Sequence, residues 1–73
     1  MTTYTVAIAT WYSDSWHVDN STMSGFVTES EAVNISQQWR KRGGFPLCME
    51  YENGIETRVL IEFEGKLTAA FGL

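Results

Sequence analysis

The sequence predicts an α+β fold in which one helix packs on an antiparallel sheet of four or five strands, in the order strand, strand, helix, strand, strand. Three observations lead to this prediction. Residues near both ends alternate between apolar and polar side chains, as strands do. A helix start signal stands near the middle, at Thr28. In the second half, Asn53-Gly54 separates two alternating runs, which is typical of a β-hairpin.

The first third of the chain predicts two strands joined by a turn. Residues 3–12 alternate and are rich in β-branched and aromatic side chains. Residues 13–15 form a polar turn cluster. Residues 16–27 predict a second strand that is weaker in its middle. We therefore expect a first hairpin ahead of the helix.

A three-residue loop in this first hairpin sets the expected register. Tyr12 would then pair with Trp16, and Thr10 with Val18. This register predicts that Tyr12, Trp16 and Val18 share one sheet face with Tyr4. Trp11 would point to the opposite face because successive strand residues alternate.

The helix is expected over residues 29–42. Thr28 and Glu31 form a capping box, in which the hydroxyl accepts from a first-turn amide and the carboxylate reaches back to the cap. Basic residues 40–42 suit the negative end of the helix dipole, and Gly43-Gly44 ends the helix. One side of the helix carries a narrow stripe that can pack on a sheet, made of Ala32, Ile35, Ser36 and Trp39.

The register of the second hairpin decides which side chains share a face. A two-residue loop at the Asn-Gly pair would set Met49 beside Arg58 and mix apolar with charged residues on each face. A three-residue loop over 52–54 pairs Tyr51 with Ile55 and avoids this mixing. The sequence therefore favours the three-residue loop. The apolar residues expected to face inward are Leu47, Met49, Tyr51, Ile55, Val59, Ile61 and Phe63.

This register predicts an acidic, solvent-facing surface on the second hairpin. Its members are Glu50, Glu52, Glu56, Arg58 and Glu62. Two interpretations stay open. The glutamates could simply keep a small protein in solution. Alternatively, they could form a surface for a basic partner, because neighbouring like charges on a sheet are mildly destabilising and a binding role would account for their presence.

The C-terminal segment follows a turn at residues 64–66. Residues 67–73 are expected to form either a short fifth strand or a flexible apolar tail. With 73 residues and no linker or repeat, the chain is expected to fold as one domain over 1–73.

Composition bounds the class of protein. The net charge is −4, from nine acidic and five basic residues, which disfavours direct binding to nucleic acid. Cys48 is the only cysteine, so an intrachain disulfide is impossible and a reducing compartment is favoured. We find neither a signal-peptide pattern nor an apolar run long enough for a membrane helix. A cytoplasmic location, away from membranes, is expected.

The titratable residues do not predict an enzyme. A catalytic set needs a nucleophile, a base and an orienting group within reach of each other. The chain has one histidine, His17, and one cysteine, without a supporting motif. The same scarcity disfavours a metal site. We expect no catalytic residues, no metal and no cofactor.

An aromatic group brackets the first turn. Trp11, Tyr12 and Trp16 stand within six positions of each other. Part of this group could pack in the core. Alternatively, it could be a hot spot for protein binding, since Trp and Tyr carry much of the energy of interfaces. At least one of the three is expected to point away from the helix.

In its format the whole chain is similar to the small proteins that bacteriophages make to disable host machinery. It is short and acidic, with antiparallel strands around one helix and no catalytic set. Two groups resemble it: inhibitors of bacterial RNA polymerase and anti-CRISPR proteins. The resemblance includes no diagnostic motif, so it assigns no site residue.

The resemblance implies a protein-binding inhibitor, a monomer or homodimer that meets a host protein complex with a basic surface in the cytoplasm of the bacterial host cell. The charge is too sparse to imitate DNA, so blocking a protein contact is favoured over occupying a DNA channel. Inhibition of transcription initiation at bacterial RNA polymerase is preferred. The alternatives are an anti-CRISPR inhibitor of a CRISPR effector complex and a structural protein that assembles as a homodimer.

Overall fold

A five-stranded antiparallel sheet carries one helix on one of its faces, as the sequence predicts. The computed structural model describes residues 1–70. The strand order across the sheet is β2-β1-β3-β4-β5. The elements along the chain are β1 (Thr2–Tyr12), β2 (Ser15–Asp19), the 3-10 turn η1 (Asn20–Thr22), α1 (Glu29–Lys41), β3 (Pro46–Glu52), β4 (Ile55–Phe63) and β5 (Lys66–Ala69).

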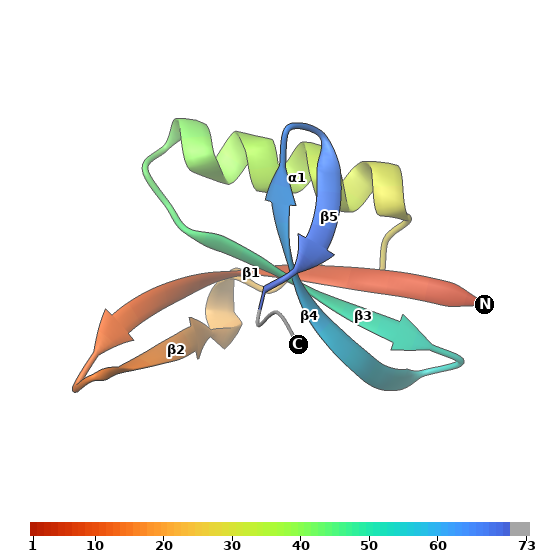
Figure 1. Cartoon of the computed structure of the whole chain (residues 1–73), viewed down its shortest axis with the longest axis horizontal. Helices are drawn as coiled ribbons and strands as arrows, with labels where there is room; N and C mark the ends of the chain where they lie inside the picture. The colour runs from red at the N-terminus through yellow and green to blue at the C-terminus, as the bar shows by residue number, and fades with distance from the viewer. Residues whose placement is uncertain (71–73) are drawn as a thin grey trace.

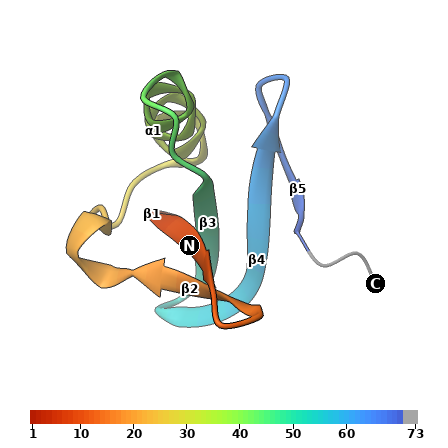
Figure 2. The ribbon, with the colours of Figure 1, turned by 90° about the vertical axis from the view of Figure 1, so that its left-hand side faces the viewer.

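The sheet is strongly twisted, as the right-handed twist of strands requires. In Figure 1, β1 runs across the view, whereas the upper part of β4 and all of β5 lie roughly vertical and point in opposite directions. Figure 2 shows α1 nearly end-on, with β4 and β5 standing beside it. The central position of β1 and β3 means that their side chains form most of the buried surface on both faces.

The helix begins and ends where the sequence predicts. The Thr28 hydroxyl accepts from the Glu31 amide at 3.3 Å, and the Glu31 carboxylate accepts from the Thr28 amide at 2.9 Å. This reciprocal pair satisfies two of the amides that a helix start leaves free. At the other end, Gly43 takes a φ of 85°, which glycine adopts without strain.

The main core lies between α1 and the sheet. Ala32 and Ser36 are fully buried, and Ile35 and Trp39 pack at the edge of this core, so the predicted helix stripe is confirmed. The sheet contributes side chains at even-numbered positions of three strands: Tyr4, Val6, Cys48 and Leu60.

A second, smaller core covers part of the sheet face that points away from α1. Four odd-numbered residues of β1 and β3 are at most 5% exposed there and form the cluster: Ala7, Ala9, Leu47 and Met49. Four partly buried residues pack against this cluster: Tyr51, Val59, Ile61 and Ala70.

The second hairpin has the loop that the sequence pattern disfavours. Glu52 pairs with Ile55 and Tyr51 with Glu56, so the Asn-Gly pair alone forms the turn. Both of its residues have positive φ, as a two-residue hairpin turn of this kind requires. The predicted three-residue loop is therefore wrong.

A β-bulge restores the pairing of apolar residues. Thr57 has no partner in the ladder, because Glu50 pairs with Arg58 on one side of it and Tyr51 with Glu56 on the other. The extra residue shifts the alternation of β4 by one position. Met49 therefore pairs with Val59, and the predicted common face is confirmed for Leu47, Met49, Tyr51, Val59 and Ile61.

Two members of that predicted face are not buried. Ile55 is 71% exposed because it precedes the bulge and so lies on the other face. Phe63 is 60% exposed at the far end of β4, beyond the second core. The inward set that we expected is thus shorter by one residue at each end of the strand.

The first hairpin is also tighter than predicted. Ser13 and Asp14 form a two-residue turn, both with positive φ (51° and 63°). Trp11 therefore pairs with Trp16, and the predicted pairing of Tyr12 with Trp16 is wrong. The one-residue shift moves Trp16 and Val18 to the face away from α1.

The expected second strand over 16–27 is shorter in the structure. β2 ends at Asp19, whose carboxylate caps the turn η1. The chain returns to β1 at Val27, which forms an isolated bridge with Tyr4. At the C-terminus, β5 confirms the fifth strand; Phe71, Gly72 and Leu73 lie outside the described residues.

Candidate protein-binding surface

The acidic surface predicted on the second hairpin does not form as one solvent-facing patch. Glu62 is 2% exposed and lies under α1. Its carboxylate accepts from the Gly65 amide at 2.7 Å and the Gln37 side chain at 3.2 Å, and it lies 3.7 Å from Arg40 Nε. The outward position expected for Glu62 is wrong, because α1 covers the even-numbered face. This carboxylate joins the helix to the β4–β5 turn.

Glu50 is also turned toward the helix side and is engaged within the sheet. Its side chain is only 13% exposed, and Arg58 binds both of its oxygens, at 2.9 Å and 2.8 Å. Thr57 adds a third hydrogen bond at 2.7 Å. These hydrogen bonds, with that of Arg58 first, lower the pKa of Glu50 to about 2. The two charges neutralise each other, so this pair does not attract a basic partner.

Two of the predicted glutamates remain on the surface. Glu52 accepts hydrogen bonds from the Thr2 hydroxyl and, at 3.1 Å, from the N-terminal ammonium of Met1, and these two bonds lower its pKa. Glu56 is exposed and forms no ion pair within residues 1–70. Of the predicted acidic set, Glu56 is therefore the carboxylate left for an outside cation.

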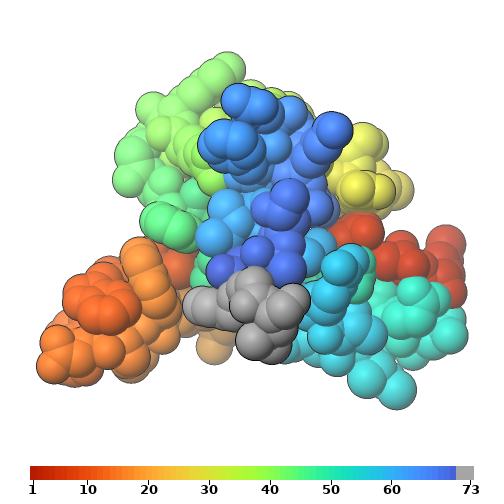
Figure 3. Space-filling model, in the orientation of Figure 1, coloured from red at the N-terminus to blue at the C-terminus, as the bar shows by residue number. Residues whose placement is uncertain are grey.

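The aromatic group at the first turn is exposed, as the binding interpretation requires. Trp11 is 57%, Tyr12 67% and Trp16 42% exposed. Trp11 and Trp16 form a cross-strand pair with ring centroids 5.4 Å apart, edge to face. Both lie on the sheet face away from α1, which confirms that at least one of the three does. The hairpin projects at the lower left of Figures 1 and 3.

The structure adds aromatic residues that sequence reasoning did not select. Phe45, 40% exposed, packs against Trp16 with ring centroids 4.8 Å apart. Phe26, 65% exposed, meets Tyr51 edge to face at 5.1 Å. Phe45 and Phe26 stand in loops, where alternation gives no signal. Phe45 is placed by the end of α1 that precedes it, and Phe26 by the segment that returns to β1 at Val27.

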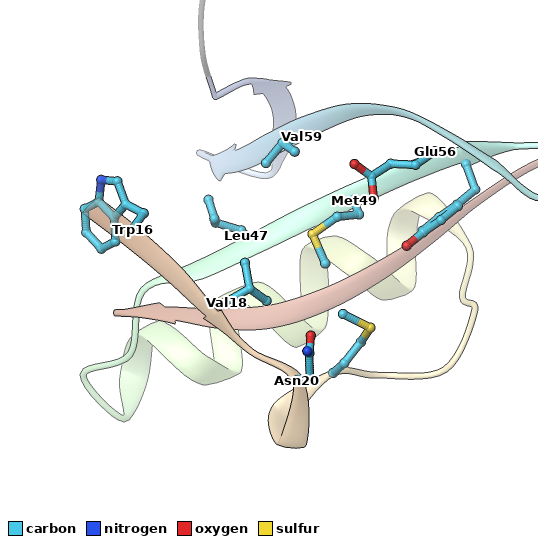
Figure 4. A pocket seen from close by; sticks show the side chains of 9 residues that line it. Trp16, Val18, Asn20, Leu47, Met49, Glu56 and Val59 are labelled. Atoms are coloured by element: carbon cyan, nitrogen blue, oxygen red, sulfur yellow. The ribbon is translucent and has the colours of Figure 1, made fainter. Parts of the chain in front are cut away.

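A groove lies on the same face. Its volume is about 320 Å³. Trp16 stands at one end and Glu56 at the other, with Val18 and Leu47 between them (Figure 4). The remaining lining is mainly apolar: Asn20, Met23, Met49, Tyr51 and Val59. We call this feature the aromatic groove.

Small side chains on β1, the strand between β2 and β3, explain why a groove exists at this place. Ala7 and Ala9 on β1 are buried between larger residues of β2 and β3. Thr5 lies on the same face, since it pairs with Met49, and its hydroxyl has no hydrogen-bond partner in the described part of the chain. The sequence signal was present as Thr5-Ala7-Ala9, but its meaning depends on which face the helix takes.

The candidate catalytic residues do not form a catalytic pair. His17 Nε2 lies 3.0 Å from both the Ser15 hydroxyl and the Tyr12 carbonyl, within the first hairpin. Cys48 is buried under α1, 3.2 Å from the Ser36 hydroxyl, and burial raises the pKa of its thiol. Over residues 1–70, His, Cys, Asp and Glu side chains gather nowhere in a group that could hold a metal ion.

Comparison with protein-family models, curated proteins and solved structures gives no match to the chain. In the described part of the chain, the helix is neither long nor apolar enough to cross a membrane. The candidate site therefore rests on its own geometry: exposed aromatic side chains beside an apolar groove.

Proposed function

We propose that this protein is a non-enzymatic binding module that engages another protein through the sheet face away from α1. The observation that carries the proposal is the exposure of Trp11, Tyr12 and Trp16 beside the aromatic groove. Exposed Trp and Tyr beside a concave apolar surface are the residues that dominate the energy of protein interfaces.

The order within the surface also supports binding. Trp16 is held between Trp11 and Phe45 by ring contacts at 5.4 Å and 4.8 Å. An aromatic side chain that is already ordered loses less conformational entropy when a partner arrives. The contiguous rings would bury a large apolar area on binding, whereas they remain partly in water in the free chain.

For the partner, we propose a host nucleic-acid-processing complex, with bacterial RNA polymerase first and a CRISPR effector complex second. The support is the format of the chain, which is similar to phage inhibitors of both. The corrected geometry changes the expected contact: the anchors are aromatic, and the acidic hairpin contributes Glu56 instead of a row of glutamates. A homodimer through the same face is a further candidate, because the face is apolar.

The test measures binding of the intact chain to purified bacterial RNA polymerase holoenzyme, and separately to purified CRISPR effector complexes. Trp11→Ala should weaken binding at least about 10-fold, since it removes one of the exposed aromatic anchors. Ile55→Ala is the matched control. Ile55 is equally apolar and 71% exposed, but it lies on the other face, so its removal should leave the affinity unchanged.

Three outcomes would count against the proposal. Equal effects of the two substitutions would show that the aromatic face is not the interface. Binding to neither class of complex would remove the proposed targets. Light scattering that shows a stable dimer, disrupted by Trp11→Ala, would favour the structural homodimer instead.

A further inference from the structure

We propose that the aromatic groove receives a large apolar side chain that is flanked by a lysine or arginine in the partner protein. This inference rests on the proposed function and specifies the partner's chemistry at that surface. It follows from the size of the groove, from the side chains that line it, and from the position of one free carboxylate.

The size of the groove fits side chains better than a cofactor. Its volume of about 320 Å³ lies at the lower limit of the roughly 300–1,000 Å³ that small-molecule sites occupy. An interface anchor is typically one large side chain that fills a pocket while its neighbours exclude water. The groove has room for such an anchor together with the stem of a neighbouring residue.

The lining favours an apolar occupant of variable shape. Met23 and Met49 offer flexible thioether side chains that adapt to different shapes, and Leu47 and Val59 supply the aliphatic surface between them. The aromatic end at Trp16 can pack against a ring or an aliphatic chain. These side chains carry no charge that would pair with a charged anchor.

The charge arrangement favours a cation next to that anchor. Glu56 stands at the end of the groove opposite Trp16 (Figure 4) and, among residues 1–70, is the only charged residue of the lining. Arg58, two positions further along β4, is bound by Glu50 on the face toward α1, so it does not neutralise Glu56. A partner lysine or arginine would meet an unpaired carboxylate there, whereas a partner acid would meet a like charge.

The test uses three short peptides as probes: acetyl-Gly-Leu-Arg-Gly-amide, the same peptide with Glu in place of Arg, and the same with Ser in place of Leu. The intact chain carries ¹³C-labelled methionine methyl groups, which NMR observes directly. Met23 and Met49 line the groove, whereas Met1 is 87% exposed at the N-terminus and serves as an internal control.

The Leu-Arg peptide should shift the methyl signals of Met23 and Met49 and leave that of Met1 unchanged, with millimolar affinity. It should bind about threefold more tightly than the Leu-Glu peptide, the size expected for one exposed charge contact. Glu56→Gln should abolish this preference, whereas Glu29→Gln should not, since Glu29 is the first residue of α1. The Leu-to-Ser peptide should bind too weakly to detect.

Equal binding of the Leu-Arg and Leu-Glu peptides would overturn the inference, and so would shifts confined to Met1. Deletion of residues 71–73 tests whether the chain's own C-terminal end occupies the groove. That occupant would be indicated if the deletion shifts the methyl signals of Met23 and Met49 and the full chain binds no peptide. Methyl shifts that grow with protein concentration would assign it to a second copy. These results leave the Trp11→Ala test of the proposed function standing, because Trp11 lies outside the groove lining.

Discussion

Among the side chains of residues 1–70, Thr5 carries a buried hydroxyl without a hydrogen-bond partner. The residue is 3% exposed and pairs with Met49 beneath the aromatic groove. A buried polar group of this kind costs about 1–3 kcal/mol relative to a satisfied one.

Thr5→Val should therefore raise the free energy of unfolding by about 1 kcal/mol, because it replaces the hydroxyl by a methyl group of similar size. Urea unfolding followed by circular dichroism measures the change. Thr5→Ser is the control: it keeps the hydroxyl, removes a buried methyl and should lower stability by about 1 kcal/mol. A less stable Thr5→Val protein would mean that the hydroxyl has a partner after all.

The Glu50–Arg58 pair predicts a pH dependence with a definite sign. The pKa of Glu50 is lowered from 4.5 to about 2, chiefly by its hydrogen bonds to Arg58 and then Thr57. A depressed carboxyl pKa stabilises the fold above the unfolded value of 4.5, and this contribution is lost as the pH falls toward 2. Stability should therefore decrease over this interval.

Glu50→Gln isolates that contribution. At pH 7 the substitution should lower the free energy of unfolding by about 1 kcal/mol, and at pH 3 the difference from the unmodified chain should shrink. Glu56→Gln is the matched control, since Glu56 is exposed and outside the ion pairs of the described chain. A difference between the Glu50→Gln and unmodified proteins that stays constant from pH 7 to pH 3 would contradict this assignment.

At the scale of elements, the β-bulge in β4 reconciles a two-residue turn with a common apolar face. Thr57 is the extra residue, and on both sides of it the pairs match as a regular ladder would require. If Thr57 instead took a regular place in the ladder, the turn pair Tyr51–Glu56 would set Met49 opposite Arg58, and the pair Met49–Val59 could not form. The bulge also places Glu56 beside Tyr51 at the groove, and Arg58 beside Glu50 on the other face.

Deletion of Thr57 should consequently preserve the fold. The remaining pairs would form a continuous ladder, at the expense of the Thr57 hydroxyl bonds to Glu50, so we expect a loss of about 1 kcal/mol. Deletion of Ile61 is the contrasting control, because it would turn the residues on one side of it to the wrong face. Amide NMR spectra distinguish the two. If deletion of Thr57 disrupted the fold as much as deletion of Ile61, Thr57 could not be the extra residue that the ladder can lose.

The elements differ in how well the sequence predicted them, and the reason is local. The capping box at Thr28 and the glycine end of α1 depend on neighbours within four positions, so pattern reading placed both helix ends. The two-residue turn at Ser13 and Asp14 was not predicted, because residues other than glycine seldom adopt positive φ. The bulge was not predicted, because Thr57 is an ordinary strand residue and only the pairing on both sides of it reveals the bulge.

The candidate site was predicted in part for a related reason. The exposed aromatic residues of the first hairpin could be named from their crowding around a turn. The acidic surface could not be judged, because β1, β3 and β4 carry apolar residues on both faces and the sequence does not say which face α1 covers. Once α1 lies on the even-numbered face, Glu62 becomes buried and Glu50 becomes half of an ion pair.

At the scale of the whole molecule, two cores share the sheet, and the proposed binding hairpin extends beyond both. Val6 and Ala7, at the centre of β1, are fully buried on opposite faces. By contrast, each residue of β2 is exposed, and β2 forms one edge of the sheet. Segments with little buried apolar surface open locally at low free energy, without unfolding the rest. The hairpin should therefore be the part that a partner orders.

Hydrogen exchange tests this distribution of stability. The hydrogen-bonded amides of β2 should exchange at least about 100-fold faster than those at the centres of β1 and β3, because the centre opens only in global unfolding. A bound partner on the aromatic face should slow exchange in β2 and leave the slow amides of β3 unchanged, since it closes the local opening alone. Uniform rates across β2 and β3 would mean that the hairpin unfolds with the cores, and a partner would then stabilise the molecule as one unit.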